Sequence, residues 1–321
     1  MMLRRIGYGV ALAMLLAAPF FVYPVFLMTV LCFALFACAF NLLIGYTGLL
    51  SFGHAAFFGG AAYITGHAVS KMGLPLEAGI FLGTATGAAI GLIMGFLAIR
   101  RTGIYFTMIT MALAQMLYFI FLQAPFTGGE DGLQGVPRGK LLGLVDLTND
   151  LNMYYLVLAI AAGSFALIMR TVHSPFGQVL KAIKENEPRA ISLGYDVDKY
   201  KLLAFTLSAA LSGLAGSTKT MVFGFATLTD VHWHMSGLVV LMTLVGGLGT
   251  LVGPIVGALI IIALENKLGD FGYWLAAATN VQWLKSIGES VTMVTGLIFI
   301  ICVLAFRRGI VGEIAALFKR S

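Results

Sequence analysis

Long apolar runs separated by short polar segments cover most of the chain, and their lengths are typical of helices that cross a membrane. A helix needs about 20 apolar residues to span the hydrocarbon core of a bilayer. The pattern predicts spans near residues 6–23, 25–44, 55–69, 74–99, 104–123, 151–169, 202–220, 236–245, 253–264 and 288–306. We therefore expect an all-α polytopic membrane protein with about ten transmembrane helices, in one domain over residues 1–321.

The first apolar run allows two interpretations. Arg4 and Arg5 precede it, and Ala17-Ala18 could serve as a signal-peptide cleavage site. The run can equally be a retained span that ends where Pro19 and Pro24 interrupt the apolar pattern, and we favour this second interpretation.

Residues 174–201 form the longest strongly polar segment of the chain, within a predicted loop over residues 171–201. Ser174 followed by Pro175 is a helix start signal, with a hydroxyl N-cap and proline at the first helical position. An apolar helix face follows, because residues at positions i, i+3, i+4 and i+7 are apolar: Phe176, Val179, Leu180 and Ile183. Pro188 can open a second short helix, which Gly194 would end. We expect a docking element for a soluble partner; the alternative is a basic loop held near lipid headgroups.

Glycine spacing predicts close helix packing in the fourth span. Its glycines recur at every fourth position: Gly79, Gly83, Gly87, Gly91 and Gly95. Residues four apart lie on one helix face, so this stripe forms a groove in which another helix can approach closely.

A second kind of glycine pattern breaks the apolar runs, at residues 45–60 and 246–250. Irregular backbone at membrane depth survives only beside protein or a water-filled cavity. We therefore take four polar residues in or just before the first break as candidates for the wall of a transport path: Asn41, Thr47, Ser51 and His54. The alternatives are a packed gate or hinge that never meets cargo, and, for His54, a purely structural hydrogen bond.

Composition supports the membrane class and charge gives its orientation. The chain is 60% hydrophobic and 11% charged, against about 25% charged residues in soluble domains. With the N-terminus inside, 14 of the 20 Lys and Arg residues fall in inside segments and 6 in outside segments or span ends. Both termini and residues 171–201 are then cytoplasmic, and residues 125–150 form an external loop. Spans two to five and seven to ten start in opposite directions, which allows an inverted repeat.

The chain lacks the sequence motifs of common catalytic sites. It contains no GxxxxGK[ST] phosphate loop, no GxSxG and no HExxH. His232 and His234 flank Trp233 without an evident third ligand, so we expect an aromatic belt there and no metal. The sequence has no cluster of Lys and Arg combined with aromatic residues, so it does not predict nucleic-acid binding. We therefore expect that this chain is not an enzyme, does not bind ATP through a phosphate loop and holds no cofactor.

Three segments resemble one family of transport proteins. They are residues 41–59, residues 177–216 and residues 246–254. The middle segment carries Gly177, Ala182-Ile183-Lys184-Glu185-Asn186, Ala190, Gly194 and the run at 200–205. It resembles the cytoplasmic coupling loop of permease subunits in ATP-binding-cassette importers, of the branched-chain amino acid (LivM and LivH) type. The superfamily's Glu-Ala-Ala motif is altered here to Glu187-Pro188-Arg189-Ala190.

The resemblance implies an importer in a bacterial inner membrane. Its partners would be a second permease subunit forming a heterodimer, two cytoplasmic ATPases that bind ATP and Mg, and an external solute-binding protein. The residues it assigns to ATPase coupling are Phe176, Gly177, Val179, Leu180, Ile183, Glu185, Glu187, Ala190 and Gly194. The expected cargo is leucine, isoleucine or valine. Urea, amides or aromatic acids remain alternatives, as do an ion-coupled secondary transporter and a channel or receptor-like scaffold.

Overall fold

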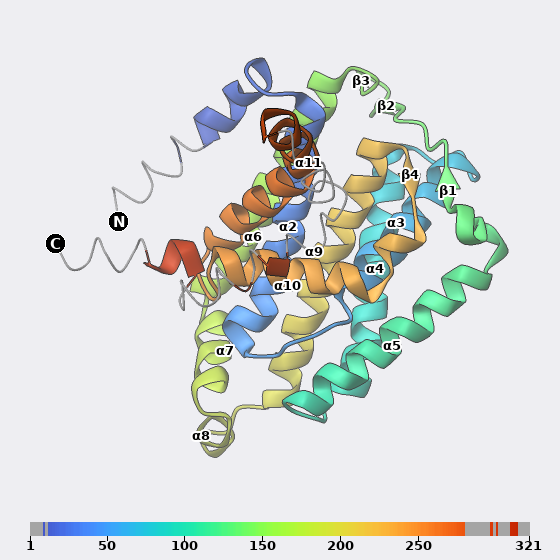
Figure 1. Cartoon of the computed structure of the whole chain (residues 1–321). Helices are drawn as coiled ribbons and strands as arrows, with labels where there is room; N and C mark the ends of the chain where they lie inside the picture. The colour runs from blue at the N-terminus through green and yellow to red at the C-terminus, as the bar shows by residue number, and fades with distance from the viewer. Residues whose placement is uncertain (1–8, 10–11, 280–295, 298–299, 301–308, 314–321) are drawn as a thin grey trace.

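The computed structural model describes residues 9, 12–279, 296–297, 300 and 309–313, and this part of the chain is mostly helical (Figure 1). The longer helices are α2 (Pro24–Thr47), α3 (His54–Ser70), α4 (Leu76–Ala98), α5 (Ile104–Gln123), α6 (Asp150–His173), α9 (Val197–Phe223), α10 (Trp233–Gly246) and α11 (Gly253–Thr279). The short helices are η1 (Ala18–Phe20), η2 (Pro125–Thr127), η3 (Gly129–Asp131), α7 (Pro175–Glu185), α8 (Glu187–Ser192) and η4 (Leu228–Asp230).

Four two-residue strands complete the described elements: β1 (Leu133–Gln134), β2 (Lys140–Leu141), β3 (Val145–Asp146) and β4 (Phe225–Ala226). β1 pairs antiparallel with β4, with Leu133 opposite Ala226, and β2 pairs antiparallel with β3. The first pair fastens the segment between α5 and α6 to the chain that follows α9.

Helix α2 lies at the centre of the bundle, packed against α6, α9 and α11. In its most apolar 18-residue window, 83% of the residues are buried, against 28% in α4 and 22% in α5. The exposed side chains of α4 and α5 are large and apolar, including Phe81, Ile93, Phe96, Met108 and Phe119. A soluble protein rarely exposes such a surface, so these faces are suited to lipid.

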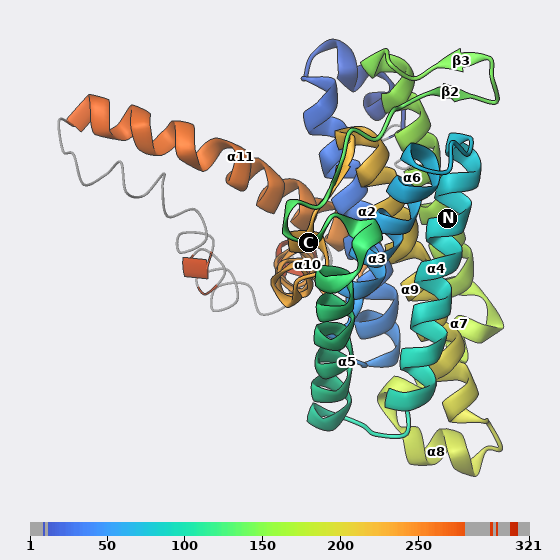
Figure 2. The ribbon, with the colours of Figure 1, turned by 90° about the vertical axis from the view of Figure 1, so that its right-hand side faces the viewer.

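The two ends of the bundle carry different elements (Figure 2). Helices α7 and α8 lie at one end together with the α4–α5 turn, which contains Arg100 and Arg101. The β2–β3 hairpin lies at the opposite end. The basic α4–α5 turn and residues 171–201 therefore share one end of the molecule, as their charge predicts.

By length and composition, four described helices could cross a membrane: α2, α4, α5 and α6. Helix α3 has 17 residues and α10 has 14, fewer than the about 20 that a bilayer requires. The predicted last span at residues 288–306 lies almost entirely outside the described residues. A multi-helix membrane bundle is thus established for the described part, and the count of about ten spans is part of the proposal below.

One helix boundary was predicted wrongly. Helix α11 continues to Thr279, whereas the apolar pattern placed its end near residue 264. The polar run of Glu265, Asn266 and Lys267 ends the apolar pattern there. Polar side chains do not end a helix by themselves, because the backbone hydrogen bonds continue through them.

The glycine stripe of α4 lies in the contact with α3 and α9. A Cβ built on Gly83 would lie 2.1 Å from Thr65 Oγ1 and 2.2 Å from Ser217 Oγ. On Gly87 it would lie 2.9 Å from the Cα of Gly213. A larger side chain at either position would therefore push the helices apart.

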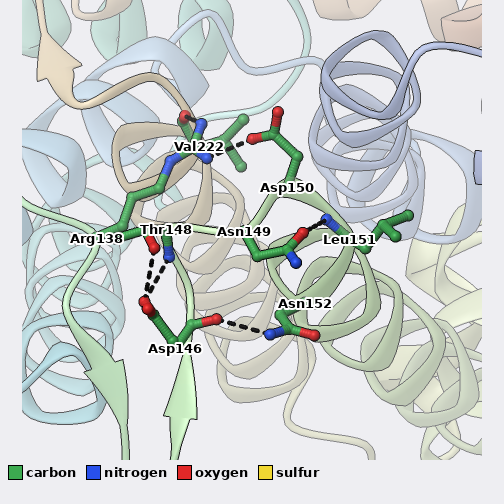
Figure 3. Close-up of polar contacts among 8 residues, drawn as sticks. All are labelled: Arg138, Asp146, Thr148, Asn149, Asp150, Leu151, Asn152 and Val222. Carbon is green, nitrogen blue, oxygen red and sulfur yellow. Dashed lines mark hydrogen bonds and ion pairs between the residues drawn. The ribbon is translucent and has the colours of Figure 1, made fainter.

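Polar contacts hold residues 138–152 against the end of α9 (Figure 3). Arg138 donates to Asp150 Oδ1 at 2.5 Å and to the carbonyl oxygen of Val222 at 2.7 Å. Thr148 donates both its N–H and its O–H to Asp146 Oδ1. These two hydrogen bonds lower the pKa of Asp146 by stabilising its carboxylate. The segment is thereby fixed at the hairpin end of the bundle.

Candidate functional site

The α7–α8 unit has the helix–kink–helix form that the sequence predicts. Ser174 caps α7, its hydroxyl accepting the N–H of Gly177 at 3.3 Å. Asn186 caps α8 and accepts the N–H of Arg189 at 3.1 Å. Gly194 follows α8 with a φ of +86°, a conformation that glycine adopts without strain. Local capping chemistry therefore sets both helices.

The apolar face of α7 is covered by this chain itself. Leu180 is 1% exposed and Ile183 is 3% exposed, and Ile183 packs with Ala190 and Val197. The ring of Phe176 stacks on Tyr200 at 5.5 Å between centroids. Ile183 thus packs within this chain, between α7, α8 and α9. The assignment of Leu180 and Ile183 to ATPase coupling stays a prediction.

Gly177 and Ala190 also face inward. A Cβ on Gly177 would lie 2.4 Å from the carbonyl oxygen of Thr171, so a larger residue would separate α7 from the end of α6. Ala190 is 2% exposed. Both residues shape the unit from within.

The outward side of the unit carries two apolar residues that the sequence interpretation missed. Ile191 is 57% exposed and Leu193 is 67% exposed. Glu185, Arg189 and Gly194 are exposed beside them. The sequence did contain a sign of this exposed apolar surface. Both residues are apolar in a strongly polar segment, and neither lies on the helix face that contains Ala190.

Two lysines fasten the unit to the bundle. Lys201 of α9 is 2% exposed, and its Nζ lies 2.6 Å from Glu187 Oε1 at the start of α8. Lys184 Nζ donates to the carbonyl oxygen of Gly45 at 2.7 Å, in the last turn of α2. A cation at the carboxyl end of a helix is favourable, because it satisfies an orphan carbonyl and opposes the helix dipole. The α7–α8 unit is thus joined directly to the helix that precedes the first glycine break.

The two glycine breaks meet at Asn41. Its Oδ1 accepts the N–H of Gly249 at 2.9 Å, and its Nδ2 donates to the carbonyl oxygen of Thr250 at 2.8 Å. A Cβ on Gly45 would lie 3.0 Å from the Cα of Gly249. Asn41, a predicted path residue, thus joins α2 to the α10–α11 connection in this structure.

The other three candidate path residues are also buried and hydrogen-bonded within the chain. Thr47 donates to the carbonyl oxygen of Leu43 at 2.6 Å, and Ser51 accepts the N–H of Gly53 at 3.1 Å. His54 Nε2 lies 2.9 Å from Ser208 Oγ, and Ser208 donates to the carbonyl oxygen of Ala39. In this conformation His54 thus makes a structural hydrogen bond, which was the alternative considered for it.

A buried ion pair near the hairpin end was missed. Lys219 Nζ lies 2.8 Å and 2.7 Å from the two carboxylate oxygens of Asp230. The sequence interpretation placed Lys219 at an outer span end and did not single out Asp230. The sequence could have indicated this ion pair, because a lysine lies inside an apolar helix and an aspartate follows 11 residues later. Within the described residues, no group of three His, Cys, Asp or Glu side chains could hold a metal ion.

Comparison with known families identifies the class of protein. The family model "Branched-chain amino acid transport system / permease component" matches residues 24–306. The chain belongs to this family.

The most similar relatives include LivM proteins. The chain is 27% identical over 254 residues to the "High-affinity branched-chain amino acid transport system permease protein LivM" of Salmonella typhimurium, and 26% identical over 254 residues to that of Escherichia coli. Each alignment covers 72% of this chain and 60% of the LivM protein. The ribose import permease protein RbsC of Bacillus subtilis is 29% identical over 174 residues, which is 52% of this chain and 51% of RbsC.

Among solved structures, PsaBC from Streptococcus pneumoniae in complex with Fab matches with 16% identity over 91% of this chain and 95% of that chain. The TM-score of 0.42 is too low to show a common fold.

Relatives named for branched-chain amino acids, ribose and autoinducer 2 all align with this permease chain. Family membership therefore fixes the class as a transport permease component and leaves the solute open.

Proposed function

We propose that this chain is the membrane-spanning permease subunit of an ATP-driven importer that receives branched-chain amino acids from an external binding protein. The family match and the LivM relatives support the class and the cargo. The proposal includes a bacterial inner-membrane location, about ten spans, cytoplasmic termini and a heterodimer with a second permease subunit. ATP and Mg would be bound by two separate ATPases.

The observation that carries the proposal is the construction of the α7–α8 unit. Caps and a buried apolar face make the unit rigid, and Ile191 and Leu193 stand exposed on its outward side. We assign ATPase docking to this outward side, which also presents Glu185 and Arg189. Residues 171–201 then form the cytoplasmic coupling loop.

Contacts of Lys184 and Asn41 provide a route from this unit to the glycine breaks. A shift of α7 would act on the Gly45 carbonyl through Lys184. Asn41, one turn earlier on α2, would pass the shift to Gly249 and Thr250. Coupling between distant sites needs such a contiguous chain of packed or hydrogen-bonded groups with two arrangements.

At the opposite end, residues 125–150 form the surface that the binding protein would meet. The contacts of Arg138 and Asp146 hold this segment in place without a partner. A preorganised surface costs less to bind than a segment that must first be ordered. Other solutes of the family, including those of the ribose and autoinducer 2 permeases, are the alternative cargo.

The test is ATP-dependent leucine uptake by the complete complex in proteoliposomes, with Ile191→Asp and Leu193→Asp variants of this chain. Each variant should lose most ATPase co-purification and uptake, because a charge would enter a desolvated apolar contact. The matched control is Lys199→Ser, whose side chain is 79% exposed on the same segment; this variant should behave as the wild type. Uptake that continues without ATPase subunits would refute the proposed class.

A further inference from the structure

The Lys219–Asp230 pair is the most deeply buried ion pair among the described residues. Its side chains are 9% and 3% exposed, whereas each of the other described pairs has at least one partner above 30%. Lys219 lies one turn before the end of α9, and Asp230 is the last residue of η4. Asp230 Oδ2 also accepts the N–H of Thr227 at 3.3 Å.

Stability alone does not account for such a pair. Removing both ions from water costs several kcal/mol, and apolar replacements of buried pairs are often neutral or stabilising. Lysine and aspartate side chains are almost never fully buried unless they are paired, so this pair is kept at the hairpin end at a cost in desolvation. The pair therefore calls for a functional explanation.

Apolar residues flank both members of the pair along the chain. Met221, Val222, Ala226, Leu228 and Val231, which flank it in sequence, all belong to one buried hydrophobic cluster. Lys219 Nζ also lies 5.5 Å and 5.1 Å from the ring centroids of Phe223 and Phe225. Sites for small molecules have this composition, an apolar wall with a few placed polar groups.

Tyr63 of α3 supplies an unused polar group beside the pair. Its side chain is fully buried, and its hydroxyl has no hydrogen-bond partner among the described residues. Tyr63 belongs to the same buried hydrophobic cluster as Met221 and Val231. One turn earlier, a Cβ on Gly59 would lie 2.7 Å from the carbonyl carbon of Asp230, so α3 lies directly against η4. A buried hydroxyl without a partner costs free energy, which a ligand could recover.

We propose that Lys219, Asp230 and Tyr63 form an occluded binding site for a zwitterionic α-amino acid. This inference rests on the proposed function and assigns its cargo contacts. The ligand's carboxylate would bind Lys219 and its ammonium group would bind Asp230, with the Tyr63 hydroxyl donating to the carboxylate. The ligand's apolar side chain would pack against the surrounding hydrophobic cluster.

The site would be selective for a zwitterion because Lys219 and Asp230 each exchange the other for a charged group of the ligand. A zwitterion breaks one ion pair and forms two, so no buried charge is left alone. A neutral sugar or a ligand with a single charge would separate Lys219 from Asp230 and leave at least one of them unpaired, at a high cost. The empty site closes by re-forming its own pair, which competes with the ligand and keeps binding weak enough for release.

The first experiment compares the double variant Lys219→Met/Asp230→Asn with the wild type in the reconstituted complex, since asparagine keeps an oxygen that can accept the N–H of Thr227. Removing both charges together avoids an orphaned ion, so the variant should keep its melting temperature and its ATPase stimulation by the binding protein. Leucine uptake should fall at least about tenfold, the loss expected for charged hydrogen-bonded contacts. Wild-type leucine uptake by this variant would overturn the assignment and show the pair to be dispensable for transport.

Tyr63→Phe keeps the test decisive even if the double variant fails to fold, since it leaves the ion pair intact. It should reduce leucine uptake about fivefold, as expected for the loss of one hydrogen bond. The matched control Tyr155→Phe removes a partly exposed hydroxyl on α6 and should leave uptake unchanged. Unchanged uptake by Tyr63→Phe would overturn the proposed site, because the site includes this hydroxyl as a contact to the ligand's carboxylate. Failure of the wild-type complex to take up leucine with ATP would instead refute the proposed function itself.

Discussion

At the scale of single residues, buried polar side chains in this bundle serve mainly to satisfy backbone groups. Asn41, Ser208 and Ser236 each donate to a main-chain carbonyl of another segment. Unsatisfied backbone groups are costly inside a membrane, and helix ends and glycine breaks create them. The candidate path residues therefore have structural partners in this conformation, and any cargo contact would require these hydrogen bonds to rearrange.

Ile183 gives a residue-scale prediction. Ile183→Ala should lower the free energy of unfolding by about 2–5 kcal/mol, the usual cost of emptying a buried aliphatic site. Ile183→Asp should cost more and reduce the yield of assembled complex, because it places a charge between α7, α8 and α9. Thermal unfolding in detergent would measure both effects. A well-folded Ile183→Asp variant that has lost ATPase coupling would instead support the prediction that Ile183 contacts the ATPase.

At the scale of elements, the glycine stripe of α4 and the α7–α8 unit depend on different physics. The stripe allows backbone-to-backbone approach of α4 to α3 and α9, where dispersion contacts replace the hydrophobic effect as the driving force. The α7–α8 unit depends on caps, a small apolar cluster and two lysine anchors. The glycine stripe is packed inside the bundle, whereas the α7–α8 unit keeps an exposed side with Ile191 and Leu193.

Gly87→Leu tests the stripe. The new side chain would begin 2.9 Å from the Cα of Gly213 and 3.0 Å from the carbonyl oxygen of Ala209. Separation of the helices should cost at least about 1–3 kcal/mol and lower the melting temperature. Gly163→Leu on α6 is the matched control, because a Cβ there meets nothing within 4 Å. Equal melting temperatures for the two variants would rule out a tight seam at Gly87.

At the scale of the whole molecule, the α8 end and the hairpin end are linked through the centre of the bundle. Helix α2 carries the Lys184 contact at its end and packs against α6, α9 and α11. Helix α9 begins beside α8 and ends beside Asp230. One rigid element therefore spans from the proposed ATPase contact to the proposed cargo site.

Alternating access predicts that the first glycine break changes its exposure during transport. Thr47 and Ser51 are 4% and 0% exposed here, so cysteines at these positions should resist a water-soluble thiol reagent in this state. We expect labelling to appear when ATP or the loaded binding protein shifts the conformation. The background would lack Cys32, Cys38 and Cys302, and Leu193→Cys, at a site 67% exposed, would be the positive control. Inert cysteines in every state, with transport intact, would leave the break purely structural.

The sequence by itself determined the class of protein, most helix positions and the form of the α7–α8 unit. Apolar run length, caps such as Ser174 and Asn186, and glycine spacing act locally, so they can be read without a fold. The tertiary structure decided which faces are covered. Ile183 packs with Ala190 and Val197, Asn41 bonds to residues 249–250, and Lys219 pairs with Asp230. Neither the burial of an apolar face nor the partner of a buried charge follows from periodicity, because both depend on segments that only folding brings together.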